Sequence, residues 1–128
     1  MAWWIYKYNA AVWGDWDHFF NNPLTHWGTT EDIPQLESLT AGDMVIAYQT
    51  DRNELVGVAK VKPFRKRDGH FELHLKPIEE IRSKVRPLKV DPKIAAIPAL
   101  MSRARKTLHE MTHAEANVLI RAARKAKS

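Results

Sequence analysis

The sequence predicts an α+β domain in which a curved β-sheet or barrel is closed by a C-terminal helix. In the N-terminal part, several runs alternate apolar and polar residues with a period of two, as half-buried strands do. Beyond Thr112 the apolar residues instead recur at the 3.6-residue period of an amphipathic helix. A chain of 128 residues can bury its own core, so we interpret residues 1–128 as a single domain.

Four segments carry the strand signal. The first strand is predicted at residues 2–8, "AWWIYKY", because aromatic and β-branched side chains favour extended backbone. Two β-rich runs at 43–50 and 54–61 flank the polar residues 51–53, a pattern typical of a hairpin, and both are expected to lie centrally in the sheet. A further strand is predicted at 70–78, where apolar and polar residues alternate.

The other segments are predicted as loop and short helices. Residues 9–29 are rich in turn-forming residues and are interpreted as a loop. A short helix is expected at 31–39, where acidic residues open the first turn. Another helix should begin at Pro92, because Asp91 can cap it and proline is favoured at the first helical position. Pro98 limits how far that helix continues.

The spacing H-E-x-x-H occurs at His109, Glu110 and His113, and on one continuous helix it can present two zinc ligands and a catalytic glutamate. Thr112 and Glu115, however, have the spacing of a capping box, which places the helix start between the two histidines. The apolar stripe beyond this cap consists of Ala116, Leu119, Ile120 and Ala123. We therefore interpret the motif as a chance match and predict no metal site.

Composition excludes several kinds of chemistry. With no cysteine, the chain cannot form disulfides, iron–sulfur clusters, thiolate zinc sites or a cysteine nucleophile. Neither a nucleotide-binding glycine motif nor a nucleophile elbow occurs, so no cofactor and no catalytic residue are predicted. The opening "MAWWIYKYN" does not resemble a signal peptide, and no long apolar segment follows. We expect a cytoplasmic protein without a membrane partner.

Basic residues exceed acidic ones by 20 to 15, which gives a formal net charge of +5. This surplus favours polyanions, chiefly nucleic acid, although it would also serve solubility. The cations gather at 60–67, 82–89 and 121–127. The candidates for contacting a phosphate backbone are Arg52, Lys62, Arg65, Lys66, Arg67, Arg82 and Lys84.

Five tryptophans exceed what the core of so small a domain requires, and Trp13, Trp16 and Trp27 fall in the predicted loop. Taken singly, each would also fit a core position. Aromatic faces hold a flat nucleobase well, at about 1–3 kcal/mol per stacked base, while nearby polar groups read its edge. The tryptophans together suggest an aromatic cage around a base flipped out of its stack.

The order of these features resembles the EVE domain, a family of the PUA-like superfamily that also includes YTH domains. The opening "WWIYKYN", the pair "GDMVIAYQT" and "LVGVAKV", and the closing "TLHEMTHAEANVLI" are similar to that family's motifs. The resemblance implies a small curved sheet or barrel of about five to six strands with flanking short helices and a C-terminal helix. It also implies a pocket for modified nucleobases in DNA or RNA, such as 5-methylcytosine or 5-hydroxymethylcytosine.

Carried over position by position, the resemblance places the pocket at the end of the first strand, in the tryptophan-bearing loop and at the end of the "AYQT" strand. The implied pocket residues are Lys7, Tyr8, Asn9, Trp13, Trp16, Trp27, Tyr48, Gln49 and Thr50. Two departures bear on the ligand. An Arg-Asn pair that the family has after its loop tryptophan is absent after Trp27-Gly28, and the family's Tyr-His-Ser is Tyr48-Gln49-Thr50 here.

Two other classes of function stay open at this point. A protein-interaction module would use exposed aromatics as interface anchors; these are Trp13, Trp16, Phe19 and Phe20. A nucleotide-processing enzyme would need an acid or base in the pocket; the candidates are Asp15, Asp17 and His18. The sequence leaves open which base is bound, whether a separately encoded nuclease or other effector takes part, and the oligomeric state, for which we expect a monomer.

Overall fold

The computed structural model describes residues 1–9, 11, 26–29, 38–63, 66–67, 70–73, 75–100 and 108–127. Five strands form one sheet in the order β7-β4-β3-β1-β8; they are β1 (Trp3–Tyr8), β3 (Met44–Gln49), β4 (Glu54–Val61), β7 (Leu75–Lys84) and β8 (Leu108–Met111). A three-stranded sheet has the order β2-β6-β5; its strands are β2 (His26–Thr29), β5 (Lys66–Arg67) and β6 (His70–Leu73). The helices are α3 (Val85–Leu88), α4 (Pro92–Ala95), the 3₁₀ turn η2 (Pro98–Leu100) and α5 (His113–Lys127).

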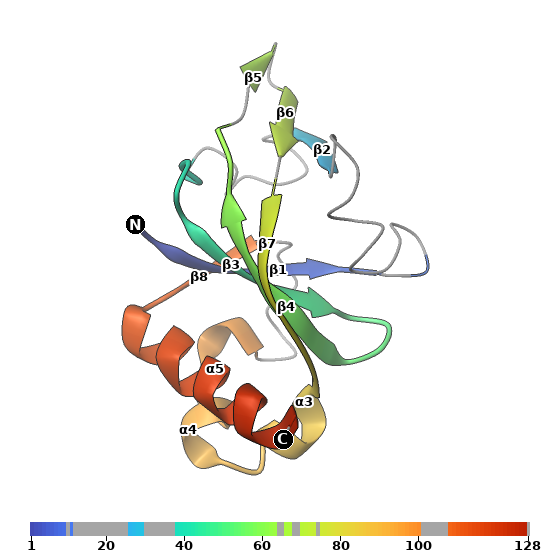
Figure 1. The fold of residues 1–128 in the computed structure, drawn as a ribbon, viewed down its shortest axis with the longest axis vertical. Helices are drawn as coiled ribbons and strands as arrows, with labels where there is room; N and C mark the ends of the chain where they lie inside the picture. The colour runs from blue at the N-terminus through green and yellow to red at the C-terminus, as the bar shows by residue number, and fades with distance from the viewer. Residues whose placement is uncertain are drawn as a thin grey trace.

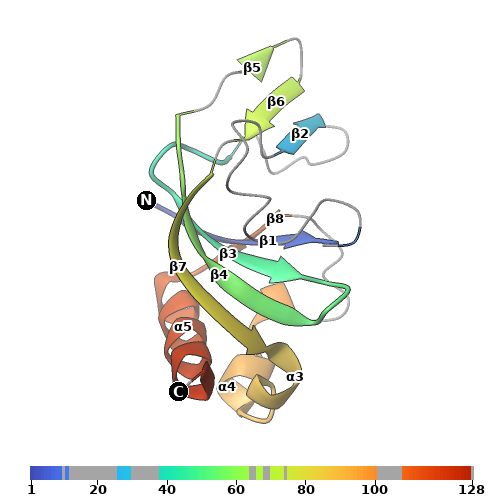
Figure 2. The ribbon, with the colours of Figure 1, turned by 45° about the vertical axis from the view of Figure 1, so that its right-hand side comes forward.

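The main sheet separates the helices from the small sheet. In both views α3, α4 and α5 lie at one end of the long axis and β2, β5 and β6 at the other, with the curved main sheet between them (Figures 1 and 2). The predicted α+β fold class, a curved sheet with short helices and a C-terminal helix, is confirmed. The sheet is open, with β7 and β8 at its two ends in the strand order. It is mixed, because β1 is parallel to β3 and antiparallel to β8.

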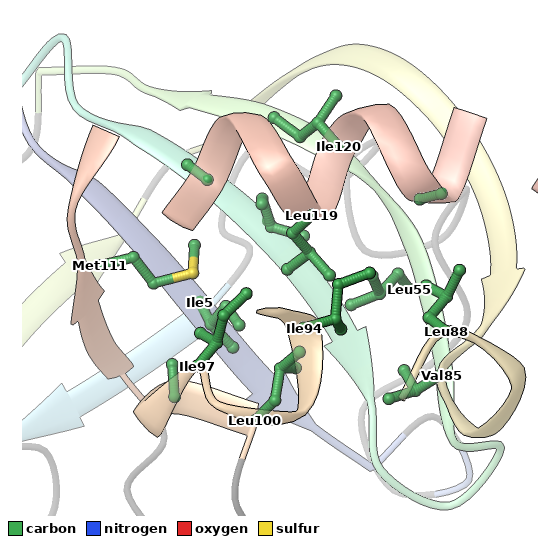
Figure 3. Packing of buried hydrophobic residues seen from close by; sticks show 14 of the residues in the cluster. Ile5, Leu55, Val85, Leu88, Ile94, Ile97, Leu100, Met111, Leu119 and Ile120 are labelled. Carbon is green, nitrogen blue, oxygen red and sulfur yellow. The ribbon is translucent and has the colours of Figure 1, made fainter. Parts of the chain in front are cut away.

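Each face of the main sheet has its own apolar cluster. Strand residues that point toward the helices, such as Ile5 of β1, pack with residues of α3, α4, η2 and α5, such as Ile94 and Leu119 (Figure 3). We call this the helix face. The opposite face carries an aromatic row from β1, formed by Trp4, Tyr6 and Tyr8. We call it the aromatic face, and it is turned toward the end of the molecule that carries the small sheet (Figure 2). Alternation along β1 and β3 distributes successive residues between the two faces.

The N-terminal part of the predicted sheet forms largely as expected. The strand predicted at 2–8 is β1, and the predicted hairpin is β3 and β4, which pair antiparallel at the centre of the main sheet. β4 carries an irregularity between Leu55 and Gly57, where its register with β7 shifts. A β-bulge of this kind bends the strand and increases its twist, which contributes to the curvature.

Two predictions on strands and loops are wrong. The single strand expected at 70–78 is two strands, because β6 pairs with β2 and β5 whereas β7 pairs with β4 in the other sheet. The segment 9–29 is not entirely loop, since β2 occupies its C-terminal end and Trp27 pairs with Glu72. Residue pairing across the sheets, which local sequence does not encode, decides both outcomes. The helix expected at 31–39 lies almost entirely outside the described residues.

The helix starts are predicted well. Asp91 caps α4 through a 2.9 Å hydrogen bond from the Lys93 backbone N–H, but α4 ends at Ala95 and the chain makes a separate turn at Pro98. At α5, the Glu115 N–H donates to Thr112 Oγ1 at 3.1 Å, and the Thr112 N–H donates to Glu115 Oε1 at 2.8 Å. This is the predicted capping box.

The capping box settles the geometry of the H-E-x-x-H segment. His109 and Glu110 lie in β8, which the sequence did not predict, whereas His113 begins α5. The two histidines therefore do not lie one turn apart on a helix, as the zinc motif requires. Within the described part of the chain, no three potential metal ligands come together. None of the helices described here has the length and apolar character needed to span a bilayer.

Asp43 fixes the entry into the sheet. Its carboxylate is 2% exposed and accepts hydrogen bonds of 3.0 Å from the Ala2 N–H, the Trp4 indole N–H, and both the N–H and hydroxyl of Thr40. Burial alone would raise the pKa of Asp43, but these hydrogen bonds outweigh it and hold the pKa below its ordinary value. The Gly-Asp of "GDMVIAYQT" is thus a structural element that joins the starts of β1 and β3.

Candidate nucleic-acid interface

The carboxyl ends of β1 and β3 bring most of the implied pocket residues into one neighbourhood. The two strands are parallel, with Lys7 opposite Tyr48 and Tyr8 opposite Gln49. The pairing continues one step further, because the Thr50 N–H donates to the Tyr8 carbonyl at 2.9 Å. Carboxyl ends of adjacent parallel strands are a common position for ligand sites, since loops diverge there.

On the aromatic face, Tyr8 and Gln49 form a buried polar pair. The Gln49 Nε2 donates to the Tyr8 hydroxyl at 3.0 Å, and the two residues are 0% and 4% exposed, Gln49 being the more buried. The Tyr8 ring is tilted by 46° against that of Tyr6, with 5.7 Å between ring centroids. Burial, and then the neighbouring Tyr8, raise the pKa of Tyr6. The amide of Gln49 and the phenols of Tyr6 and Tyr8 are thus buried together at the carboxyl ends of β1 and β3.

On the helix face, Lys7 and Tyr48 form a different group. Tyr48 packs against the helix-face cluster, and its hydroxyl donates to the side-chain oxygen of Asn53 in the hairpin turn. Burial raises the pKa of Tyr48. Burial also lowers the pKa of Lys7, and the nearby positive charge of Lys89 adds to this shift. The structure therefore does not bring Tyr48 and Lys7 onto the face that carries Tyr8 and Gln49.

Asn9 and Thr50 lie at the rim between these faces. The Asn9 side-chain oxygen accepts a 2.9 Å hydrogen bond from the Ala11 N–H, so it stabilises the turn after β1. The exposed Thr50 hydroxyl lies 3.3 Å from the Tyr8 carbonyl. Both side chains have at least part of their surface open to solvent, which leaves room for an external partner.

Of the tryptophans assigned to the pocket, the structure places only the backbone of Trp27, in the second position of β2. β2 belongs to the sheet on the side of the aromatic face (Figure 2). Trp13 and Trp16 lie outside the described residues, as do the aromatic and acidic residues on which the interaction-module and enzyme hypotheses depend.

Four of the residues predicted to contact phosphate have described side chains, and these four lie in two different environments. Arg52 and Lys62 are exposed, at the hairpin turn and just after β4. Arg82 and Lys84 instead face carboxylates: Glu54 lies 3.6 Å from Arg82 and 3.7 Å from Lys84. Arg82 also has a φ of 56° and lies 3.8 Å from Glu80. Arg65 lies outside the described residues, and for Lys66 and Arg67 only the backbone of β5 is described.

The carboxylates of these ion pairs are not among the candidates that the sequence indicates. Glu54 was assigned only to a strand, and nothing local connects it with cations about thirty positions later in the chain. Lys89 belongs to the basic cluster at 82–89 but is not among the residues predicted to form the site. Lys89 follows α3, and its positive charge contributes to the lowered pKa of Lys7.

A shallow groove of about 290 Å³ lies between α4 and the first turns of α5. Its lining is Lys93, Ala96, Ile97, Ala114, Glu115 and Val118. Because α4 and α5 cover the helix face, this groove is separated by the main sheet from the Tyr8–Gln49 pair.

No protein-family model and no curated protein sequence matches this chain. Solved structures do match over nearly its whole length. Rpa0253 from Rhodopseudomonas palustris has a TM-score of 0.78 and 19% identity, covering 96% of this chain and 93% of that one. Human THYN1 in complex with 5-methylcytosine-containing DNA has a TM-score of 0.68 and 12% identity, covering 96% and 98%. This chain therefore shares its fold with these proteins.

A third match extends the comparison to an RNA complex. The YTH domain of Zygosaccharomyces rouxii MRB1, solved with N6-methyladenosine RNA, has a TM-score of 0.67 and 18% identity, covering 99% of this chain and 89% of that one. Identities this low show a shared fold. In both complexes the partner is a nucleic acid with a methylated base.

Proposed function

We propose that this chain is an EVE-type reader of modified nucleobases, which binds DNA or RNA with a modified base flipped into an aromatic cage. The cage would lie on the aromatic face, between the ends of β1 and β3 and the sheet that carries Trp27. The observation that carries the proposal is the buried Tyr8–Gln49 hydrogen bond of 3.0 Å at the carboxyl ends of two parallel strands. A polar pair in an otherwise apolar cluster suits edge recognition of a base.

The energetics require both stacking and edge contacts. Extruding a base costs a few kcal/mol of lost pairing and stacking. Each aromatic ring that stacks on the base stabilises the complex by about 1–3 kcal/mol. Stacking tolerates every base, so selectivity must come from polar groups. We assign the walls to Trp27 and at least one of Trp13 and Trp16, and the edge contacts to Gln49, Asn9 and Thr50. Lys7 and Tyr48, on the helix face, are assigned outside the cage.

Two structural neighbours support this assignment. Human THYN1 and the yeast YTH domain cover almost the whole chain, and each was solved with a methylated nucleic acid. Both complexes show binding of nucleic acid, which favours a reader without catalytic activity of its own. Such a reader would act in the cytoplasm as a monomer. A separately encoded effector, such as a nuclease, would act on the nucleic acid that the reader binds.

The test is a binding screen with the intact chain. Duplexes carrying one cytosine, 5-methylcytosine or 5-hydroxymethylcytosine, and RNA carrying adenosine or N6-methyladenosine, are compared at one salt concentration. We expect one modified base to bind more tightly than its unmodified counterpart. Gln49→Met should reduce that ratio, and Trp27→Ala should weaken binding of the preferred ligand by about 1–3 kcal/mol. Tyr48→Phe is the control and should leave the ratio unchanged.

Each variant is first shown to be folded, because a tryptophan that only fills the core would lower stability by a few kcal/mol and imitate a binding defect. Equal affinity of the parent for all modified and unmodified ligands would rule out the reader function. If only Trp27→Ala bound as well as the parent under fully native conditions, the cage would have to be placed elsewhere on the aromatic face.

A further inference from the structure

Lys60 and Lys76 are placed directly opposite each other by the antiparallel pairing of β4 and β7. The side chains of such a pair leave the same face of the sheet, with about 4.5–5.5 Å between their Cβ atoms. Lys60 is also paired with Met44, which packs against the helix-face cluster, so both lysines leave the helix face. Both are exposed, so the helices leave them open to solvent. Like charges in this arrangement oppose folding.

The carboxylates of β4 and β7 are already engaged with other cations. Glu54 and Glu80 lie 3.6 Å and 3.8 Å from Arg82. Glu79 accepts a 2.8 Å hydrogen bond from Nε of Arg124 in α5. These glutamates are the only acidic residues of the two strands. Neither lysine of the pair forms an ion pair within the described part of the chain, so the two positive charges are uncompensated there.

The backbone that carries Lys60 is held in place on all sides. The Val61 N–H donates to the Asp43 carbonyl at 2.8 Å, and the Gly42 N–H donates to the Val61 carbonyl at 2.9 Å. Lys60 itself is paired with β3 on one side and with β7 on the other. The sheet therefore fixes the separation of the two lysines, and only their flexible stems have to converge on a ligand. Less conformational entropy is lost when a ligand binds to a frame that is already ordered.

The lysine pair lies where the small sheet departs from the main sheet. The chain leaves β4 just after Lys60, forms β5 and β6, and returns at the start of β7 just before Lys76. Both views show the small sheet beyond these strand ends (Figures 1 and 2). The exposed Lys62 follows β4 directly, and β5 consists of Lys66 and Arg67. The pair thus begins a basic stretch, as expected for a surface that contacts successive phosphates.

We propose that Lys60 and Lys76 together bind one backbone phosphate of the nucleic acid. This inference rests on the proposed function and deepens it, because neither lysine is among the residues that the sequence predicts to contact phosphate. β7 is an edge strand of the main sheet, so a nucleic-acid backbone can reach the pair around that edge. A phosphate held between the two ammonium groups attracts both and offsets their mutual repulsion. The backbone would then pass the base of the small sheet, in which β2 carries Trp27.

The binding test uses substitutions that keep the aliphatic stem and remove the charge. Lys60→Met, Lys76→Met and the double variant are measured with modified and unmodified duplexes across a salt series. The control is Lys93→Met, which changes an exposed lysine of α4 at the opposite end of the molecule (Figure 1). We expect each single variant to weaken both duplexes by about two- to fivefold at low salt. The double variant should also reduce the salt slope by about one, since one phosphate contact is lost, and Lys93→Met should match the parent.

Lys60→Glu distinguishes a loss of binding from a loss of folding. It places opposite charges at the cross-strand position, so the midpoint of thermal unfolding should rise by about 1–4 °C. The affinity for both duplexes should nevertheless fall below that of Lys60→Met, because the glutamate repels phosphate. A damaged fold would lower the midpoint and the affinity together. A higher midpoint with weaker binding therefore identifies a lysine pair that serves binding at the expense of stability.

The outcomes separate this inference from the proposed function. Unchanged affinity and salt slope in the double variant would overturn the phosphate site and leave the reader function intact. Weaker binding of the modified duplex alone would also overturn it, because a phosphate contact carries no base information. If the parent binds both duplexes equally, the reader function fails, and the same variants decide the phosphate site with the unmodified duplex. A parent that binds neither duplex would overturn both.

Discussion

Tyr8 and Lys7 illustrate how a strand assigns adjacent residues to different tasks. Tyr8 joins the aromatic face and bonds to Gln49, whereas Lys7 joins the helix face near Lys89. The resemblance to a family motif assigns both residues to one pocket, because they are contiguous in sequence. The pleat separates them, because successive side chains leave opposite sides of a strand. A strand at 2–8, which the sequence predicts, already implies that Lys7 and Tyr8 point to opposite faces.

Asp43 shows a residue whose importance is structural. It satisfies donors from the N-terminal segment, from β1 and from the turn before β3. Removing the carboxylate would leave the buried indole N–H of Trp4 without its acceptor. A buried donor left unsatisfied costs the free energy of its desolvation, which is larger than the net value of an ordinary hydrogen bond.

We predict that Asp43→Asn lowers the free energy of unfolding by about 1–3 kcal/mol at neutral pH. The folded-state pKa of Asp43 lies below its ordinary value, so its stabilisation is fully present above that ordinary value and is lost as pH falls through the folded pKa. Urea unfolding at pH 6 and below pH 4 measures this, and the variant should lose less stability on acidification than the parent. Asp91→Asn, which keeps the cap of α4, is the control. An identical pH dependence of Asp43→Asn and parent would contradict the prediction.

At the scale of elements, α5 depends on its first turn and on one apolar stripe. Ala116, Leu119 and Ala123 are fully buried, and Ile120 is 8% exposed. Arg124, on the polar side, reaches the Glu79 carboxylate of β7 through its Nε at 2.8 Å. The helix is therefore fixed to the sheet by its stripe, and the capping box determines where it begins.

Thr112→Ala should destabilise the protein by about 1 kcal/mol, because the Glu115 N–H loses its acceptor and the reciprocal bond loses its geometry. Asn117→Ala, on the exposed side of the same helix, is the control and should be neutral or slightly stabilising, since alanine favours helix. Thermal unfolding followed by circular dichroism compares the two. A loss of stability that is equal in both variants would point to a general effect of shortening a polar side chain.

At the scale of the whole molecule, the main sheet separates two surfaces. The aromatic face is turned toward the small sheet, and the helix face is covered by α3, α4, η2 and α5 (Figures 2 and 3). Nucleic acid carries one charge per phosphate, so a basic domain binds it through backbone contacts that do not depend on sequence. The proposed base pocket and the proposed backbone contacts are expected to make separate contributions to the free energy of binding.

Charge reversal at Arg65 and Lys66 should weaken binding to modified and unmodified DNA alike and flatten the salt dependence, because phosphate contacts carry no base information. The matched control is reversal of Arg121 and Lys125, which lie on the exposed side of α5, at the end of the molecule opposite β5 (Figure 1). Fluorescence anisotropy between 50 and 200 mM salt, roughly the range over which phosphate contacts change affinity strongly, measures both. Unchanged affinity at low salt would assign the 65–66 pair to solubility.

Elements that local chemistry specifies can be predicted from the sequence. The hairpin, β1, the cap at Asp91 and the capping box at Thr112 all follow from period, turn residues or caps within a few positions. The capping box likewise indicates that the H-E-x-x-H spacing crosses a helix start. These features are encoded locally because their hydrogen bonds and buried faces join residues close in the chain.

Tertiary structure alone decided the rest. The split of 70–78 between two sheets, the short strand β8 and the ion pairs of Glu54 depend on partners far away in the chain. So does the assignment of Lys7 and Tyr48 to the helix face. Alternation shows that neighbouring side chains point apart, but which side meets the helices is fixed only when the strands pair and both apolar clusters are buried at once.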